Sequence, residues 1–170
     1  LQAVPGLMEH LRHCLAVRGV RALPGVRLVV TGGDSVPPAL LDALRELFPR
    51  AELAVTYGPT ETAIFCTAHV VSGATRGHPI GTPLAGCEVW VADERGRPLP
   101  EAATGELWIG GQGVARGYLH RPDETRARFA ELDGKRFYRS GDRGRWRSDG
   151  ELEFLGRTDQ QVERAVVVHL

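Results

Sequence analysis

The residues best suited to chemistry lie in the short turn 57–61, which follows the apolar segment 53–55. Gly58 lets a main chain approach phosphate oxygens closely, and the Thr60 hydroxyl can donate a hydrogen bond to them. The carboxylate of Glu61 is a suitable ligand for the Mg²⁺ that accompanies a nucleotide. Open α/β sheets bind ligands at the carboxyl ends of their strands, so the turn favours a nucleotide site. On chemistry alone, a Gly-Pro turn with solvated polar groups explains it equally well.

Four segments together carry a more specific pattern. They read YGPTE at 57–61, GELWIGGQGVARGYL at 105–119, YRSGD at 138–142 and GRTDQQV at 156–162. In this order they resemble the YGPTE, GELxIxGxGVARGYL, Y(K/R)TGD and GRxDxQVK motifs of the adenylate-forming, AMP-binding superfamily. The long second motif is typical of amino-acid adenylation domains in nonribosomal peptide synthetases, so the chain resembles the central part of such a domain. An acyl- or aryl-CoA ligase fragment stays open as the alternative.

The resemblance implies a reaction and its partners. An amino-acid carboxylate attacks the α-phosphate of ATP in the presence of Mg²⁺, which gives aminoacyl-AMP and pyrophosphate. The acyl group then passes to the phosphopantetheine thiol of a carrier domain. The expected partners are the amino-acid substrate and the carrier and condensation domains of a parent synthetase. Such catalysis depends on positioning and on neutralising phosphate charge.

Carried over by position, the motifs imply a nucleotide-binding set: Gly33, Asp34, Tyr57, Thr60, Glu61, Asp142, Phe154 and Arg157. The resemblance implies that Glu61 binds the metal and Thr60 the α-phosphate. Asp142 matches an aspartate that accepts hydrogen bonds from the ribose hydroxyls, and a carboxylate suits a vicinal diol because both hydroxyls can donate to it. Arg157 matches an arginine that reaches the ribose and phosphate region.

The remaining members of the nucleotide-binding set are implied to lie near the adenine base. The resemblance implies that Tyr57 lines the adenine and acyl-adenylate site, with Gly33 and Asp34 at the adenine edge and Phe154 near the base. Taken alone, Tyr57 and Phe154 are better explained as core aromatic residues. The motif context reverses this for Tyr57, and less so for Phe154.

The resemblance also implies a substrate pocket beside these motifs, formed by Val30, Gly32, Thr56, Ile64 and Phe65. This wall is mostly apolar, with a small residue at Gly32 and bulk at Phe65. We therefore expect a substrate with an uncharged side chain. The rest of such a pocket, including the aspartate that binds the amino group, is expected upstream of Leu1.

Several family features are not found in this sequence. The glycine-rich phosphate loop is absent, and so is the C-terminal lysine that contacts the substrate carboxylate. Lys135 is the only lysine and lies between the second and third motifs, so no catalytic residue is assigned. Asp159 matches the family hinge residue. Because the chain opens at Leu1 without methionine, we expect it to be an internal piece of a longer protein. Since the phosphate loop and the lysine are absent, we expect the isolated piece to be inactive. A non-catalytic remnant or scaffold piece is the second alternative.

Hydrophobic spacing predicts the elements that position these residues. Leucines at 7, 11 and 15 recur at a helical period, which predicts a helix over 7–17. The apolar run 26–30 predicts a strand, followed by a tight loop and a helix with leucines at 40, 41, 44 and 47, for which Ser35 is the expected N-cap. A second strand at 53–55 completes a βαβ unit with parallel strands.

Beyond residue 86 the pattern changes to short alternating strands separated by turns, interrupted by one helix that begins near Pro122. The expected fold class is therefore α/β, with part of a βαβ layered subdomain followed by a small antiparallel β-barrel-like subdomain. We place the first subdomain at 1–86 and the second at 87–158. Residues 159–170 would be the hinge and the start of a missing C-terminal domain.

The composition excludes several other functions. With 21 Lys and Arg against 21 Asp and Glu, bulk charge favours neither nucleic acid nor an anionic membrane as partner. No apolar run approaches the roughly 18 residues of a membrane span. Three cysteines without a CxxC pattern suit thiols in a reducing compartment, which makes the cytoplasm the expected location.

Two other groups of residues have types that could bind an anion or a metal. Six basic residues between 135 and 147 surround Asp142, and they form either an anion-attracting rim or, as we favour, a solvated face. His10, His13 and Cys14 share a helical segment but lack further ligands, so no metal site is expected there. No role is assigned to the remaining histidines, His69, His78, His120 and His169.

Overall fold

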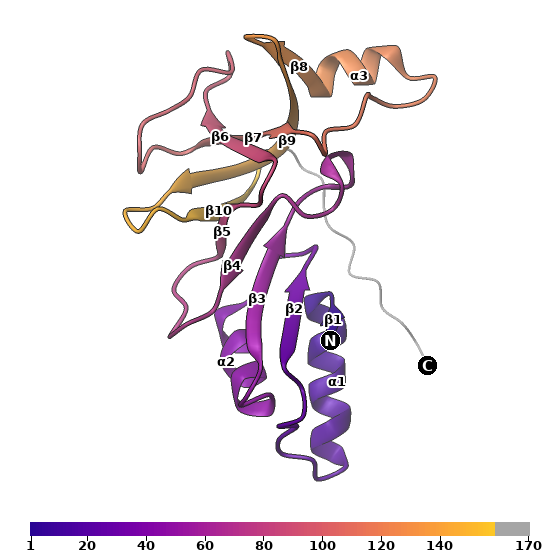
Figure 1. The fold of residues 1–170 in the computed structure, drawn as a ribbon, viewed down its shortest axis with the longest axis vertical. Helices are drawn as coiled ribbons and strands as arrows, with labels where there is room; N and C mark the ends of the chain where they lie inside the picture. The colour runs from indigo at the N-terminus through magenta and orange to yellow at the C-terminus, as the bar shows by residue number, and fades with distance from the viewer. Residues whose placement is uncertain (159–170) are drawn as a thin grey trace.

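One continuous sheet runs through residues 1–158, the part of the chain that the computed structural model describes (Figure 1). Its strand order is β1-β2-β3-β4-β5-β10-β9-β7-β6, and β8 pairs with β9 beside this path. The pairs among β1, β2 and β3 are parallel, and the later pairs are antiparallel. The structure therefore confirms the mixed α/β class.

The elements follow one another in a simple order: β1 (Gln2–Ala3), α1 (Pro5–Val17), β2 (Leu28–Gly32), α2 (Pro38–Leu47), β3 (Glu52–Tyr57), the 3₁₀ turn η1 (Thr60–Thr62), β4 (Thr67–Val70), β5 (Pro79–Pro83), β6 (Cys87–Ala92), β7 (Gly105–Gly111), α3 (Pro122–Arg128), β8 (Phe129–Leu132), β9 (Lys135–Trp146) and β10 (Leu152–Arg157). The predicted helices and strands are present. Within residues 1–158, no helix has the length and apolar character needed to cross a membrane.

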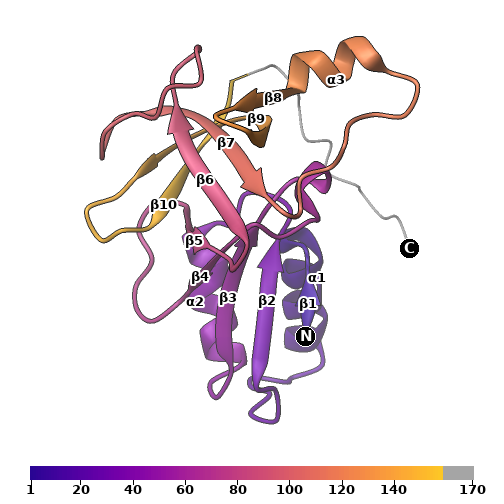
Figure 2. The ribbon, with the colours of Figure 1, turned by 45° about the horizontal axis from the view of Figure 1, so that its top comes forward.

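Helices α1 and α2 cover the same face of β2 and β3 (Figure 2). Met8 of α1 packs with Val29 of β2 and with Leu53 and Val55 of β3 in one core. That core also buries the four leucines of α2, at 40, 41, 44 and 47. Burial of a leucine side chain contributes about 1.5–3 kcal/mol, so this apolar stripe fixes the helix against the ends of the strands that form the site.

The start of α2 differs from the expectation. The N-cap is Pro37 and no side chain caps the helix, so the prediction that Ser35 is the N-cap is wrong. Two successive prolines place the first helical turn at Pro38, because proline suits a position where no intrahelical N–H bond is needed. Ser35 is thereby left in the loop, where its Oγ lies 3.4 Å from Nδ1 of His78.

Strand β5 joins the two halves of the sheet. Thr82 and Pro83 pair with β4, whereas Pro79 and Gly81 pair with β10. The second core likewise draws Ile80 of β5 together with buried residues of β6, β7 and β10. Strand β5, which ends just before the boundary expected at residue 86, thus pairs with both halves, and the division into 1–86 and 87–158 stays a proposal.

Strands β6, β7, β9 and β10 form the strongly curved antiparallel part of the sheet (Figure 1). Val89 and Val91 of β6, Leu107 and Ile109 of β7, and Leu152 of β10 are buried in its core. Strand β9 extends over 12 residues and is longer than the short strands expected beyond residue 86. Its length is what carries Asp142 to the edge of the first half of the sheet.

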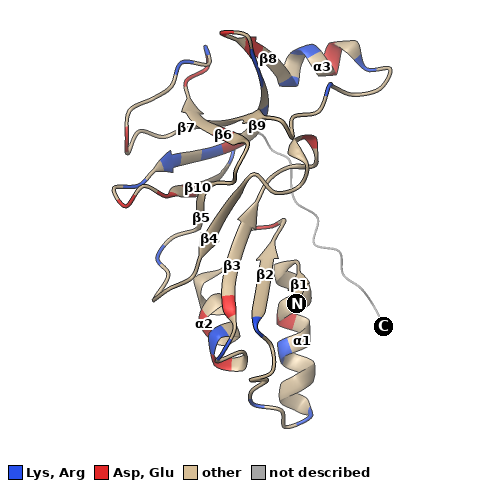
Figure 3. Ribbon diagram, viewed as in Figure 1, with Lys and Arg blue, Asp and Glu red and all other residues tan. Residues whose placement is uncertain are grey.

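The basic residues of β9 and of the turn after it lie along one strongly charged stretch (Figure 3). Most are paired with carboxylates on neighbouring segments: Lys135 with Glu88, Arg136 with Glu131, Arg139 with Glu106, Arg145 with Glu153 and Arg147 with Asp149. Exposed pairs of this kind contribute about 0–1 kcal/mol each, whereas Glu153 is buried and is held by Arg145. The pairing supports the interpretation of this stretch as a solvated face.

Gly81 provides a test of the junction at β5. Its φ is +76°, and a Cβ at this position would lie 1.8 Å from the main-chain oxygen of Ala68. Gly86 has a similar φ of +82° but open space around it. We expect Gly81→Ala to lower the free energy of unfolding by more than about 3 kcal/mol, and Gly86→Ala by about 1 kcal/mol, from backbone strain alone.

Denaturant unfolding of the two variants measures this difference. Gly86→Ala is the matched control, because it carries the same backbone strain without the collision. Equal free energies of unfolding for the two variants would contradict the close approach of β5 and β4.

Candidate nucleotide site

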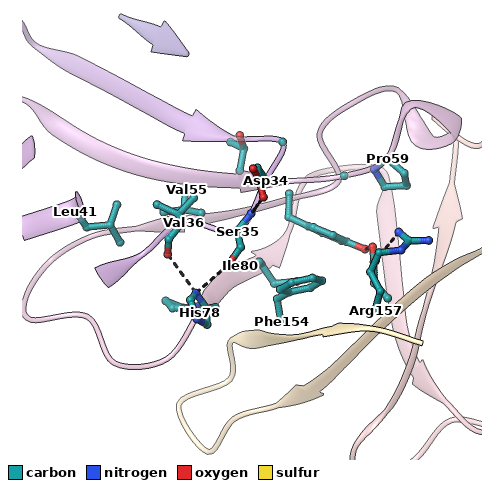
Figure 4. Close-up of a pocket in the computed structure, with 16 residues that line it drawn as sticks. Asp34, Ser35, Val36, Leu41, Val55, Pro59, His78, Ile80, Phe154 and Arg157 are labelled. Atoms are coloured by element: carbon teal, nitrogen blue, oxygen red, sulfur yellow. Dashed lines mark hydrogen bonds and ion pairs between the residues drawn. The ribbon is translucent and has the colours of Figure 1, made fainter. Parts of the chain in front are cut away.

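A cavity lies where β2 and β3 end and β10 passes beside them (Figure 4). It encloses about 160 Å³, below the roughly 300 Å³ at which pockets for small molecules begin. The described residues therefore form part of a pocket for a nucleotide-sized ligand. They are Gly33, Asp34, Ser35, Val36, Leu41, Val55, Thr56, Tyr57, Gly58, Pro59, His78, Pro79, Ile80, Asp142, Phe154 and Arg157.

The centre of this cavity is the carboxylate of Asp142, which is 7% exposed. Tyr57 donates from Oη to Oδ2 at 2.6 Å, and Arg157 donates from Nη1 to Oδ1 at 2.9 Å. A buried carboxylate is costly unless it is paired and hydrogen-bonded, so these contacts explain why the charge is tolerated there. Each carboxylate oxygen can accept more than one hydrogen bond.

Three elements position this cluster. Tyr57 is the last residue of β3, while Asp142 and Arg157 are register partners in the β9–β10 ladder. The main-chain N–H of Thr158 donates to the carbonyl of Gly141 at 2.7 Å and holds the end of β10 in place. The structure thus brings together one residue from each of the first, third and fourth motifs.

The Tyr57 phenol is a firm hydrogen-bond donor. Burial raises its pKa well above the ordinary value of 10.0, and the adjacent Asp142 charge raises it further. Burial also raises the pKa values of Tyr118 and Tyr138; the hydrogen bond to Glu61 adds to the effect at Tyr118, and the contact with Tyr118 adds to it at Tyr138. All three phenols therefore keep their protons at neutral pH.

Glu61 and Thr60 line a second, adjoining cavity. It shares Pro59 and Arg157 with the first, so Arg157 stands between Asp142 and Glu61. Glu61 and Asp142 thus line two neighbouring cavities that share Pro59 and Arg157. Their roles toward the metal, the α-phosphate and the ribose stay predictions.

The second motif supports Glu61 directly. Tyr118 donates from Oη to Oε1 of Glu61 at 2.5 Å, and the main-chain N–H of Ala115 donates to the Glu61 carbonyl at 2.8 Å. Sequence reasoning did not assign a role to Tyr118. Its place in the GVARGYL motif was the available signal, but only the fold shows that this tyrosine contacts the glutamate of the first motif.

Glu61 fits a metal that arrives with a nucleotide. Among residues 1–158, no group of three or more His, Cys, Asp or Glu side chains is arranged to hold a metal ion. Mg²⁺ is commonly held by one or two carboxylates together with substrate phosphates and water. A single carboxylate beside the arginine that borders both cavities suits that mode better than a resident metal.

The residues expected in the substrate pocket are only partly gathered at the cavity. Thr56 lines it, and Val30 and Gly32 share with Thr56 the sheet face opposite the helices. Ile64 and Phe65 follow η1, and the Ile64 side chain is 59% exposed. The substrate pocket therefore stays a prediction, with Val30, Gly32 and Thr56 on a common wall.

Several cavity residues were missed by sequence reasoning. Gly33, Asp34 and Phe154 of the predicted nucleotide-binding set line the cavity, although their places relative to the base stay predictions; Ser35, Val36, His78 and Ile80 also line it. His78 is 42 residues from Val36, whose carbonyl lies 3.2 Å from its Nδ1, and no motif relates the two positions. The proposed hinge, Asp159, lies outside the described residues.

The fold and the cavity together define an α/β chain with part of a pocket at the carboxyl ends of its strands. The family model described as "AMP-binding enzyme" matches residues 1–119, which is more than half of the chain. The chain therefore belongs to the AMP-binding enzyme family, whose members are adenylate-forming ligases.

Matches to individual proteins indicate which kind of AMP-binding enzyme this chain is similar to. The chain is 40% identical over 168 residues to the "Dimodular nonribosomal peptide synthase" of Bacillus subtilis, which covers 96% of this chain and 7% of that protein. It is 48% identical over 154 residues to "Bacitracin synthase 3" of Bacillus licheniformis, which covers 88% of this chain and 2% of that protein. The chain thus spans only a small part of these relatives.

Solved structures of nonribosomal peptide synthetases also match this chain. The nonribosomal peptide synthetase FmoA3, in its alpha-methyl-L-serine-AMP bound form, superposes with a TM-score of 0.86 at 36% identity over 94% of this chain and 19% of that chain. PA1221, described as containing adenylation and PCP domains, gives a TM-score of 0.77 at 34% identity, over 94% of this chain and 32% of that chain. These matches confirm the resemblance to nonribosomal peptide synthetase adenylation domains.

The buried phenols provide a test of the site that needs no ligand. The chain has three tyrosines, and the fold raises the pKa of each above 10.0. The unfolded chain then loses its phenolic protons first as the pH rises. We expect the contribution of the tyrosines to the free energy of unfolding to be present below pH 10 and to be lost as the pH rises above it.

Phenolate absorbance measured as a function of pH checks this expectation. In the native chain the phenolate signal should rise at higher pH than in the same chain in denaturant, whose midpoint should lie near pH 10. Coincident titration curves for the native and the denatured chain would show that the phenols are not held as described.

Proposed function

We propose that this chain is the part of an amino-acid adenylation domain that binds ATP around Asp142. The observation that supports this proposal most directly is that Tyr57 and Arg157 both donate hydrogen bonds to the buried carboxylate of Asp142, which borders a cavity. These residues come from three separate motifs that lie 85 and 15 residues apart along the chain. A structural ion pair alone would not require the cavity beside it.

In this proposal the nucleotide spans both cavities. The ribose hydroxyls donate to Asp142, while Tyr57 and Arg157 hold that carboxylate in a fixed orientation. Arg157 lies at the border of the two cavities, where its guanidinium can also face the phosphates. Thr60 and Glu61 lie beyond it and suit the α-phosphate and its metal.

The proposed reaction has two steps. A carboxylate oxygen of the amino acid forms a bond to the α-phosphorus of ATP, and the bond from that phosphorus to the bridging oxygen of pyrophosphate breaks. The thiol sulfur of phosphopantetheine then attacks the acyl carbon, releases AMP and gives up its proton. The described residues orient the nucleotide and balance its charge. Mg²⁺, held by Glu61 when bound, would neutralise phosphate charge.

The proposed partners follow from the same assignment. They are an amino acid with an uncharged side chain, and the carrier and condensation domains of a parent synthetase. The titles of the solved relatives support this: one contains adenylation and PCP domains, and another is bound to an amino-acyl adenylate. The three cysteines in the described part of the chain are free thiols, which supports a reducing, cytoplasmic location.

Pyrophosphate exchange tests the activity in the natural polypeptide that carries these residues. Exchange should depend on an amino acid and should not occur with carboxylic acids that lack the amino group. Exchange with such acids alone would instead support an acyl- or aryl-CoA ligase. Absence of exchange with either class would contradict the proposed activity and favour the non-catalytic alternative.

The residue roles are tested by removing the carboxylates one at a time. We expect Asp142→Ala and Glu61→Ala each to lower kcat/KM for ATP in this exchange by at least about tenfold, because each removes charge complementarity that the transition state uses. Asp149→Ala is the matched control. Asp149 is an exposed carboxylate in the turn after β9, paired with Arg147, and its removal should change kcat/KM by less than about twofold.

Losses smaller than tenfold for Asp142→Ala or Glu61→Ala would count against the corresponding role. The pattern is informative only if the variants fold, so far-ultraviolet circular dichroism of each variant accompanies the assay.

A further inference from the structure

His78 lines the nucleotide cavity although no motif includes it. It lies just before β5, and its main-chain oxygen accepts a hydrogen bond from the N–H of Phe154 at 2.9 Å. Figure 4 shows its ring beside the loop that carries Ser35 and Val36, with Phe154 next to it. A base that packs near Phe154, as the proposed function requires, would therefore present an edge to His78.

The contacts of the ring fix its protonated nitrogen. Nδ1 lies 3.2 Å from the carbonyl oxygen of Val36, and a carbonyl oxygen can only accept. Nδ1 must therefore carry the hydrogen, and Oγ of Ser35, at 3.4 Å from the same nitrogen, is a weaker neighbour. A neutral imidazole carries one hydrogen, so Nε2 has the lone pair and is a hydrogen-bond acceptor.

This acceptor is left available. Within residues 1–158, Nε2 makes no protein hydrogen bond, and it does not belong to the buried polar atoms that lack a partner. It is therefore open to solvent or to a ligand. Since His78 borders the cavity and its Nδ1 side is held against the loop, the opposite side of the ring carries the free acceptor.

We propose that Nε2 of His78 accepts a hydrogen bond from the exocyclic amino group of adenine and so determines which nucleobase the site takes. The proposal rests on the proposed function, because it needs a nucleotide in this cavity. A 6-oxo purine would place an acceptor against an acceptor and leave both unsatisfied. His78 is thus a specificity-determining residue, whereas Asp142 acts on the ribose.

The test compares three nucleotides in pyrophosphate exchange by the natural polypeptide. ATP has the 6-amino group, purine riboside triphosphate has only hydrogen at that position, and inosine triphosphate has an oxygen. We expect kcat/KM for ATP to exceed that for purine riboside triphosphate by about tenfold, as for loss of one buried hydrogen bond. The inosine nucleotide should be poorer still.

Substitutions then locate the discrimination. His78→Ala should bring ATP and purine riboside triphosphate to within about twofold. His78→Gln should restore part of the preference, because its side-chain oxygen can take the place of Nε2. His13→Ala, which changes an exposed histidine on α1, is the matched control and should leave the ratio unchanged.

Each outcome decides the proposal. Equal use of ATP and purine riboside triphosphate by the unmodified protein overturns it, and so does full discrimination in His78→Ala; both leave the proposed function intact. Absence of exchange with every nucleotide overturns the proposed function and this inference with it. If His78→Ala fails to fold, His78→Phe, which keeps a ring but offers no acceptor, takes its place: loss of the preference for ATP in the folded variant supports the proposal, and full discrimination overturns it.

Discussion

The buried carboxylate of Asp142 is the interaction on which the rest of this structure depends. A negative charge that is 7% exposed would be costly alone, and its hydrogen bonds to Tyr57 and Arg157 offset that cost. Those bonds form only if the end of β3 meets the β9–β10 ladder. The same contacts therefore join two halves of the sheet and shape the cavity between them.

Other contacts also hold the two halves of the sheet together and fix residues that line the cavities. Strand β5 pairs with both β4 and β10, and the close approach of Gly81 to the main chain of Ala68 allows no side chain there. Tyr118 of the second motif contacts Glu61 of the first. Each motif described in the structure thus contributes to the two cavities either by lining one or by holding a residue that does.

Local sequence patterns predicted the elements well because their causes are local. Leucine spacing gave the helices, and apolar runs gave the strands. The long-range pairing was less accessible: β5 bridges both halves, and the two prolines before α2 moved Ser35 from a helix cap to the loop beside His78. No periodicity relates residues 35–36 to residue 78, so the contacts of His78 could only be seen once the chain was folded.

The central claim is that Asp142 recognises the ribose. The most direct measurement compares ATP with 2′,3′-dideoxy-ATP in pyrophosphate exchange by the unmodified polypeptide and by Asp142→Ala. The account requires loss of the hydroxyls to lower kcat/KM at least about tenfold in the unmodified protein and less than about threefold in Asp142→Ala, because the two changes remove the same interaction. An equal loss in both proteins would contradict it.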